Sequence, residues 1–249
     1  APHPPIMVPE VGGDRARVTS ASARALEHAA TLLHAIGPDT VVLMSPHAPV
    51  TRGSFVIDDS SRTKGDLGAF GAPSVAFDLA GDPALAEAIV DHAHSAGIPV
   101  VPRSQSALLE PGVLDHGAMV PMSFLDPEGR YPLVELSLSF LPLSMHRELG
   151  MVVRRAAADL GRTVVFVASG DCSHRLTRDA PGGWSPHAAG FDAQLVSLLS
   201  NDDYEGLTHI DPSRIEAAGE CGLRSFITLG GFIAGSDART RVLAYEGPW

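Results

Sequence analysis

Residues 19–49, TSASARALEHAATLLHAIGPDTVVLMSPHAP, contain the unit from which the fold class is predicted. The segment starts with Thr and Ser, continues with apolar residues at helical spacing and ends at a Gly-Pro pair, which predicts a helix. Residues 40–45 then form a short apolar run typical of a buried strand. A loop containing His47 follows this strand. The stretch therefore predicts a helix, a strand and a loop at the strand's end.

The same unit returns along the chain. In residues 81–101, Asp82 is placed to cap a helix, Pro83 takes its first position and Gly97 ends it before another apolar strand. Because helices alternate with short apolar strands, we expect an α/β fold: a three-layer αβα single domain over residues 1–249, with a central mixed sheet flanked by helices. The strand order is left open. Further predicted elements are strands at 131–140 and 162–169 and helices at 143–161 and 186–200.

Composition excludes several classes of protein. The chain has 249 residues, 45% of them hydrophobic, which is enough for a sizeable core. A formal net charge of −11 and the lack of a dense basic run argue against nucleic-acid binding. No apolar run reaches the roughly 18 residues of a membrane span. Two cysteines do not make a disulfide scaffold, and no signal peptide is recognised at residue 1, so we expect a cytoplasmic protein.

Four histidines and one glutamate stand out by position. His47 and His174 follow predicted strands, His116 precedes a glycine, and Glu220 lies between glycines. His3 lies between two prolines, which restrict the backbone around it. In α/β folds, functional residues gather in loops at strand ends. These five residues are therefore the candidate site.

Their chemistry suits non-haem iron. A ferrous site needs two imidazoles and one carboxylate on one face and open positions on the other. His3, His47 and Glu220 could supply that set, while His116 and His174 would remain as acid/base groups. The chain has 11 histidines, so spacing alone does not select this set.

Five segments select it by resemblance. PHPPIMVPEVGG, MSPHAP, LDHGAMVPMSFL, ASGDCSH and GECGLRSF resemble, in order, the landmarks of the class III extradiol ring-cleavage dioxygenases. The resemblance spans nearly the whole chain. It implies that His3, His47 and Glu220 are metal ligands, that His174 is the catalytic acid/base, and that His116 contacts a substrate hydroxyl or bound oxygen.

The resemblance also implies cofactor and partners. The expected metal is Fe(II), with Zn(II) as an alternative in isolated protein. The expected substrates are a catecholic or aminophenol-type ring and O₂, cleaved by incorporation of both oxygen atoms. A homodimer is expected, and some members of the family work with a small second subunit. The sequence does not name the aromatic substrate.

Other interpretations stay open. The related Memo-like branch uses a histidine-rich pocket with a cysteine, so Cys172 and Cys221, which lie inside site motifs, are compatible with a metal- or peptide-binding protein without ring cleavage. Zinc hydrolysis is also compatible with two His and one Glu, although no HExxH motif is present. Glu220 could instead cap a helix that begins near Gly222. Arg175 and Arg224 could bind a substrate carboxylate or form structural ion pairs.

Overall fold

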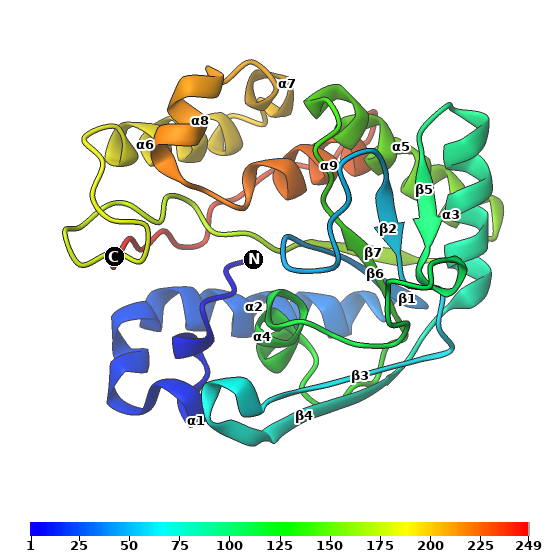
Figure 1. The fold of residues 1–249 in the computed structure, drawn as a ribbon, viewed down its shortest axis with the longest axis horizontal. Helices are drawn as coiled ribbons and strands as arrows, with labels where there is room; N and C mark the ends of the chain where they lie inside the picture. The colour runs from blue at the N-terminus through cyan, green and yellow to red at the C-terminus, as the bar shows by residue number, and fades with distance from the viewer. Residues whose placement is uncertain (249) are drawn as a thin grey trace.

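A mixed five-stranded sheet forms the centre of the molecule in the computed structural model, which describes residues 1–248 (Figure 1). The strand order is β5-β2-β6-β1-β7. β1 pairs in parallel with β6 and β7, β2 pairs in parallel with β5, and β2 meets β6 antiparallel. The predicted mixed sheet is therefore confirmed. The strands are β1 (Thr40–Ser45), β2 (Phe55–Ile57), β5 (Val100–Pro102), β6 (Leu133–Ser137) and β7 (Val164–Ala168).

Helices cover both faces of this sheet. One core packs α3, α5 and α9 against it, and a second packs α2 and α4 against the opposite face. Successive side chains of β1 point to opposite faces of the sheet, so both faces need a cover of helices. Val42 and Met44 belong to the first core, and Val41 and Leu43 belong to the second. This confirms the three-layer prediction. The covering helices are α2 (Ser20–Ile36), α3 (Pro83–Ser95), α4 (His116–Leu125), α5 (Leu143–Asp159) and α9 (Leu223–Ile233).

Smaller elements surround these layers. A third apolar cluster joins α6 (Ala188–Ser200), α7 (Tyr204–Leu207) and α8 (Pro212–Ala218) to the start of α9. An antiparallel pair, β3 (Arg62–Leu67) and β4 (Ala72–Ala80), lies outside the main sheet and covers the α4 side. The sequence analysis did not predict this pair. Short helices complete the chain: η1 (Pro5–Met7), α1 (Pro9–Gly12), η2 (Gly13–Thr19), η3 (Gly68–Phe70) and η4 (Arg103–Gln105).

The predicted helix boundaries follow from local capping. Asp82 accepts the Leu85 N–H at the start of α3. Gly37 ends α2 at φ 58°, a left-handed conformation that glycine adopts without a steric penalty. The helix predicted from residue 186 begins at Ala188, and the strand predicted at 131–140 is limited to Leu133–Ser137. No helix within residues 1–248 combines the length and apolar character needed to cross a membrane.

The sheet topology brings distant loops together. β1 and β7 are adjacent and parallel, so the loops after Ser45 and Ala168 leave the same edge of the sheet. The amino end of the chain reaches this edge as well, because the Gly170 N–H donates to the Ala1 carbonyl oxygen. The edge thus collects residues from the start, the first third and the last third of the sequence.

Candidate metal and catalytic site

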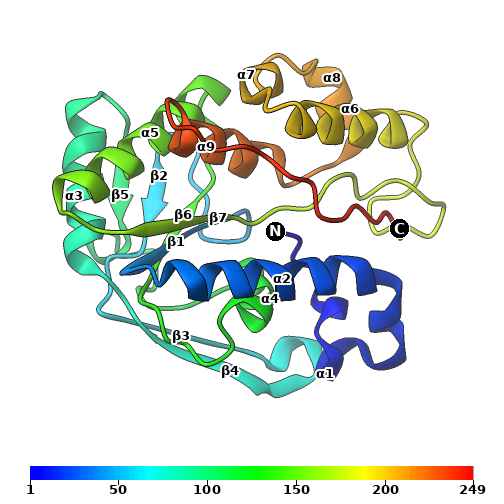
Figure 2. The same ribbon diagram turned by 180° about the vertical axis from the view of Figure 1, so that it is seen from behind.

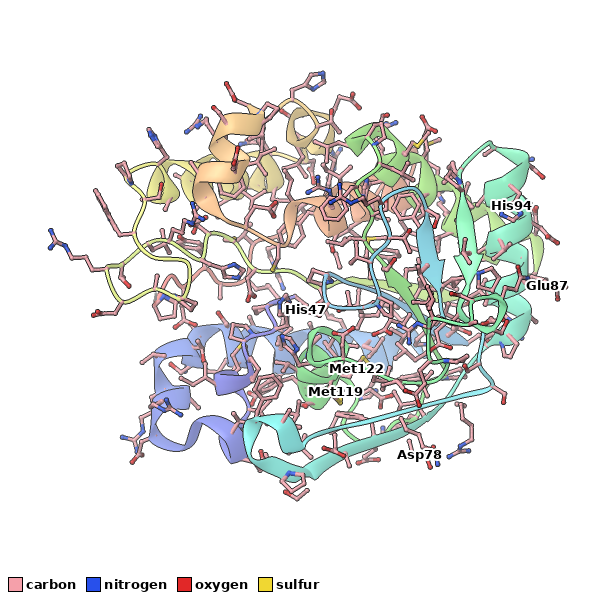
Figure 3. All side chains as sticks on the ribbon, viewed as in Figure 1. His47, Asp78, Glu87, His94, Met119 and Met122 are labelled. Atoms are coloured by element: carbon pink, nitrogen blue, oxygen red, sulfur yellow. The ribbon has the colours of Figure 1, made fainter. Side chains whose placement is uncertain are left out.

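Four of the five predicted residues meet at this edge of the sheet. The Nε2 atoms of His3 and His47 are 3.1 Å apart, and the rings of His47 and His116 have centroids 4.0 Å apart. The fourth residue, His174, is connected to this group through Cys221, whose Sγ lies 3.6 Å from His3 Nε2 and 3.8 Å from His174 Nε2. Figure 3 shows His47 between the lower part of the molecule, with α2 and α4, and the upper part, with α6 to α9.

His3 is buried and held in one tautomer. The Ser169 hydroxyl donates to the Gly117 carbonyl oxygen at 2.5 Å, and His3 Nδ1 lies 3.0 Å from the same hydroxyl oxygen. Since a hydroxyl has a single proton, Ser169 can only accept from His3, which must carry its proton on Nδ1. The Nε2 lone pair of His3 is then directed at His47, in the form that a metal requires.

Asp115 positions both His47 and His116. Its Oδ1 accepts from the Ser45 hydroxyl at 2.7 Å, and the Ser45 oxygen accepts the His47 backbone N–H. Asp115 Oδ1 also accepts the Gly117 N–H and so caps α4, whose first residue is His116. The side chain of His47 is exposed and that of His116 is half-buried. These two imidazoles therefore border the open side of the site.

His174 is paired with a carboxylate. Its Nε2 lies 3.6 Å from Asp171 Oδ2, and this interaction raises the pKa of His174. The same oxygen lies 3.6 Å from His3 Nε2, while Asp171 Oδ1 accepts the His3 backbone N–H. Burial opposes ionisation of Asp171, but its interactions with His174 and His3 prevail and lower the pKa of the carboxyl. Asp171 is thus a charged group between two imidazoles.

Two of the other imidazoles, His3 and His116, have their pKa values shifted in the opposite direction. Burial, with the nearby His47 and His116, lowers the pKa of His3 to about 4. Burial, together with His47, also lowers the pKa of His116. At neutral pH, His3 and His116 are therefore neutral, which leaves lone pairs for a metal or a proton.

Glu220 is the predicted residue that the structure places apart. Its Oε2 accepts the Leu223 N–H at 2.6 Å, so it caps the start of α9, as the helix-cap alternative expected. It belongs to neither group of metal-ligand atoms that lie within 4.8 Å of one another among residues 1–248. Burial raises the pKa of its carboxyl. The assignment of Glu220 as a metal ligand remains a prediction.

The two groups of ligand atoms share His3. One contains His3, His47 and His116, and the other contains His3, Asp171 and Cys221. Two nitrogens bound at right angles to one ion, each at about 2.1 Å, lie about 3.0 Å apart. The 3.1 Å between the His3 and His47 Nε2 atoms is close to this separation. The residues present therefore fit a divalent ion.

The cysteines differ in their surroundings. Cys221 accepts the Asp171 backbone N–H and belongs to the second group of ligand atoms. Cys172 packs against the apolar cluster of α6 to α9 and lies in neither group. Burial raises the pKa of the Cys172 thiol to about 12 and that of Cys221 further. Both are therefore neutral thiols in the absence of a metal.

A buried ion-pair network lies behind Asp115. Arg103 is 1% exposed and donates to Asp58 Oδ2 at 2.9 Å and to Glu135. Burial and the neighbouring Asp115 raise the pKa of Glu135 well above its ordinary value. The network joins residues that directly follow β2 and β5 to the middle of β6. No sequence pattern indicated it, since its residues are far apart along the chain.

The two arginines considered for substrate binding have different surroundings. The Arg175 guanidinium donates to the Glu216 and Ala217 carbonyl oxygens at the carboxyl end of α8, which is a structural role. The Nε of Arg224, like that of Arg175, is buried and has no hydrogen-bond partner within residues 1–248. A further residue that the sequence analysis missed is Phe70, whose exposed ring lies 5.2 Å from that of His116.

Comparison with known proteins relates the chain to one family and to several relatives. The family model "Catalytic LigB subunit of aromatic ring-opening dioxygenase" matches residues 1–248. The chain is 33% identical to "Protein CA_C1420" of Clostridium acetobutylicum over 99% of its own length and 53% of that protein. It is 31% identical to "4,5-DOPA dioxygenase extradiol" of Beta vulgaris, and the match covers 68% of this chain and 62% of that protein.

Two more distant relatives complete the comparison. The chain is 25% identical to "3,4-dihydroxyphenylacetate 2,3-dioxygenase" of Escherichia coli, with 64% of the chain and 59% of the relative covered. The crystal structure of uncharacterized protein JW3007 from Escherichia coli K12 matches with a TM-score of 0.62 at 22% identity, covering 87% of this chain and 83% of that one, and shows the same fold. The chain spans 53–62% of the length of these curated relatives.

Proposed function

Because the chain belongs to the family of the catalytic LigB subunit of aromatic ring-opening dioxygenases, we propose that it is an Fe(II)-dependent extradiol dioxygenase. The observation that carries the proposal is the 3.1 Å separation of the His3 and His47 Nε2 atoms beside two further imidazoles. The proposed substrate is a catecholic or aminophenol-type ring, with O₂ as co-substrate. Residues 1–249 are proposed to form one catalytic domain.

In this proposal His3 and His47 are the imidazole ligands. A bound ferrous ion would supply a centre at which the diol and O₂ lie side by side and exchange electron density. Two carboxylates compete for the third ligand position. Glu220 is assigned by family resemblance, but it lies outside both groups of ligand atoms and its Oε2 accepts the Leu223 N–H, whereas Asp171 Oδ2 lies 3.6 Å from His3 Nε2.

His116 and His174 take opposite roles in proton transfer. The pKa of His116 is lowered, so its neutral imidazole can accept a proton from a substrate hydroxyl. The pKa of His174 is raised by Asp171, so it keeps a proton that it can donate to oxygen when the O–O bond breaks. Because the two pKa values are shifted in opposite directions, His174 can serve as the acid and His116 as the base in one pocket.

The open side of the site is suited to an aromatic ring. The Phe70 ring is 5.2 Å from His116 and 40% exposed, so a planar substrate can pack against it without displacing a core residue. Two of the relatives are named for dihydroxyphenyl or DOPA substrates. We therefore propose catechols as the substrate class, and a panel of catechols tests it.

The decisive experiment is anaerobic loading with Fe(II), followed by oxygen uptake with catechol, protocatechuate, gallate, 3,4-dihydroxyphenylacetate and 2-aminophenol. We expect uptake and a ring-cleavage chromophore with at least one member. His174→Gln should retain iron and substrate binding but lose about 10²–10⁴-fold in turnover. Full uptake by His174→Gln would exclude it as the acid, and no uptake by any iron-loaded sample with the panel would favour the second candidate below.

A second candidate function is favoured by the position of Cys221. Its Sγ lies 3.6 Å from His3 Nε2, while the neighbouring Glu220 caps a helix. A cysteine ligand is the feature expected of the Memo-like branch, whose members bind metal without established ring cleavage. In that case His3 and Cys221, which belong to the same group of ligand atoms, would hold the ion, and a softer metal would be preferred.

Spectroscopy with Co(II) separates the two ligand sets. A thiolate ligand gives an intense sulfur-to-cobalt band in the near ultraviolet that Cys221→Ser abolishes and Cys172→Ser leaves unchanged. If this band is absent and Glu220→Gln or Asp171→Asn weakens binding, the carboxylate set is supported. Since the thiol of Cys221 is protonated when metal-free, a cysteine site should also release one proton on binding.

Location and assembly are also proposals. We propose a cytoplasmic homodimer, with a small second subunit as an alternative. Light scattering of the purified chain at micromolar concentration tests the dimer. A monomer that becomes active only with a co-purified small protein would favour the alternative.

A further inference from the structure

The side chain of Glu135 is a fully buried carboxyl group that the proposed mechanism does not use. It lies in the middle of β6. Leu133, two residues earlier, packs in the core with α2 and α4, so Glu135 points to the same face of the sheet. Figure 2 shows α2 and α4 together on one side of β1 and β6. Glu135 therefore faces the layer in which α4 begins at His116.

One buried cation serves three acidic groups in this layer. Arg103 contacts Asp58 and Glu135, and Asp115, at the start of α4, is the neighbour of Glu135. Asp58 is the full partner of the cation, because its Oδ2 accepts both Arg103 Nη1 and the Gly112 N–H at 2.9 Å. A single guanidinium cannot compensate three carboxylates. Ionising a fully buried group without a counter-charge of its own is strongly disfavoured, so one of the remaining two carboxyl groups should be neutral.

Asp115 receives hydrogen bonds on one of its oxygens only. Its Oδ1 accepts the Ser45 hydroxyl at 2.7 Å and the Gly117 N–H at 2.6 Å. Its position at the start of a helix also favours the ionised carboxylate. Its Oδ2, in contrast, is buried and has no donor within residues 1–248, and the same holds for Glu135 Oε1. Each of the two carboxyl groups thus has one oxygen that lacks a partner.

A shared proton would satisfy both of these oxygens. Burial is the main reason that the pKa of Glu135 lies well above its ordinary value, and the charge of Asp115 adds to it. A hydrogen bond between the two side chains raises this pKa further, while Arg103 opposes the shift. A hydrogen bond between two carboxyl groups requires a proton on one of them. Because Asp115 is the group that accepts several donors at a helix start, the proton belongs on Glu135 Oε1.

We propose that Glu135 is a positioning residue: it stays protonated in the folded protein, donates from Oε1 to Asp115 Oδ2, and so holds the carboxylate that orients two imidazoles of the site. Asp115 acts on His47 through the Ser45 hydroxyl, whose oxygen accepts the His47 N–H, and it caps the helix that begins with His116. If Glu135 were ionised, the two carboxylates would repel each other and Asp115 would turn away from Ser45. The inference rests on the proposed function only in taking His47 as a metal ligand.

Infrared spectroscopy of the metal-free protein at neutral pH tests the proton directly. We expect Glu135→Gln to remove the carbonyl band of one protonated carboxylic acid. That band should shift when the side-chain carboxyl carbons of glutamate are labelled with ¹³C, and it should not shift when those of aspartate are. Asp126→Asn is the matched control, because it alters another buried carboxyl group with an unpartnered oxygen, and it should leave this band in place. Identical spectra of the parent and Glu135→Gln, or a shift with aspartate labelling, would overturn the proposal.

Zn(II) affinity, measured by competition with a chromophoric chelator, tests the positioning role without any aromatic substrate. Glu135→Gln can still donate to Asp115 Oδ2 and accept from Arg103, so its affinity should match that of the parent. Glu135→Leu lacks the donor, and we expect its affinity to fall about 10–100-fold. Leu136→Ala removes an apolar side chain from the next position of β6, so it controls for general destabilisation and should bind as the parent does.

An Asp115→Ala background shows through which group Glu135 acts. Glu135→Leu should cause little further loss of Zn(II) affinity there, because the acceptor of its hydrogen bond is gone. Losses that add in full, equal losses in Glu135→Gln and Glu135→Leu, or parental affinity of Glu135→Leu would each refute the positioning role. If Glu135→Leu does not fold, the infrared band and the affinity of Glu135→Gln decide. A parent that binds no Zn(II) would count against the proposed metal site, whereas the infrared result would still decide the proton.

Discussion

His3 Nδ1 lies 3.0 Å from Ser169 Oγ, and the single proton of that hydroxyl is committed to the Gly117 carbonyl oxygen. This relationship fixes the tautomer of His3 and leaves its Nε2 lone pair pointing at His47. Ser169 itself directly follows β7, the edge strand of the sheet. The rigid sheet thereby sets the orientation of a residue near the amino end of the chain.

Replacing Ser169 tests this tautomer control. Ser169→Ala leaves His3 Nδ1 without an acceptor, so the ring can take the wrong tautomer or rotate. We expect affinity for Fe(II) or Zn(II) to fall about 10–100-fold, the usual effect of losing such an outer hydrogen bond. Competition titration with a chromophoric chelator measures it. Ser95→Ala, on the exposed face of α3, is the matched control, and equal affinities in the two variants would refute the role of Ser169.

The pH dependence of turnover tests the Asp171–His174 pair. The carboxylate raises the pKa of His174, so the protonated acid persists to higher pH. Asp171→Asn removes that charge, and the alkaline limb of the kcat–pH profile should move to lower pH. Because Asp171 also contacts His3, a structural effect alone would lower kcat at every pH without moving the limb. An unmoved limb would therefore contradict the control of the His174 pKa by Asp171.

The free energy of unfolding should depend on pH through His146, whose side chain is fully buried. Burial lowers its pKa from 6.5 to about 4. The imidazole of His146 therefore binds a proton more tightly in the unfolded chain than in the folded one. The stability contributed by the buried neutral imidazole is complete above pH 6.5 and is lost as pH falls from about 6.5 to about 4. Its full size is of order 3 kcal/mol.

Urea unfolding at several pH values isolates this contribution. His146→Gln should flatten the fall in unfolding free energy between pH 7 and pH 4.5 relative to the parent. The exposed His187→Gln variant should retain the parent's slope. If the slope of His146→Gln equals that of the parent, buried His3 or other groups account for the dependence instead.

The Arg103 network should be structural. Arg103→Met leaves Asp58 and Glu135 buried without their cation, and breaking such a pair from one side costs about 3–5 kcal/mol. The triple change with Asp58→Asn and Glu135→Gln should recover part of the loss, because the uncompensated charge is removed. Chemical denaturation of both variants measures this. A single variant as stable as the parent would contradict it.

Local patterns in the sequence determined the main helices and strands and pointed to several residues of the candidate site. The Thr/Ser start and Gly37 end of α2, the Asp82 cap of α3 and the apolar runs of β1 and β7 are all encoded within a few residues, so helix and strand positions could be predicted. The loops after two strands then identified His47 and His174. These predictions depend on interactions between neighbours in the chain, which a single sequence displays.

Tertiary structure decided what those patterns could not. The antiparallel meeting of β2 with β6 and the separate β3–β4 pair depend on long-range burial. Glu220 and Cys221 are adjacent, yet the turn that begins at Gly219, with φ 60°, directs the carboxylate to the Leu223 N–H and the thiol to His3. Which of two neighbouring side chains enters a site depends on the path of the backbone, and that path is set by packing against residues far away in the sequence.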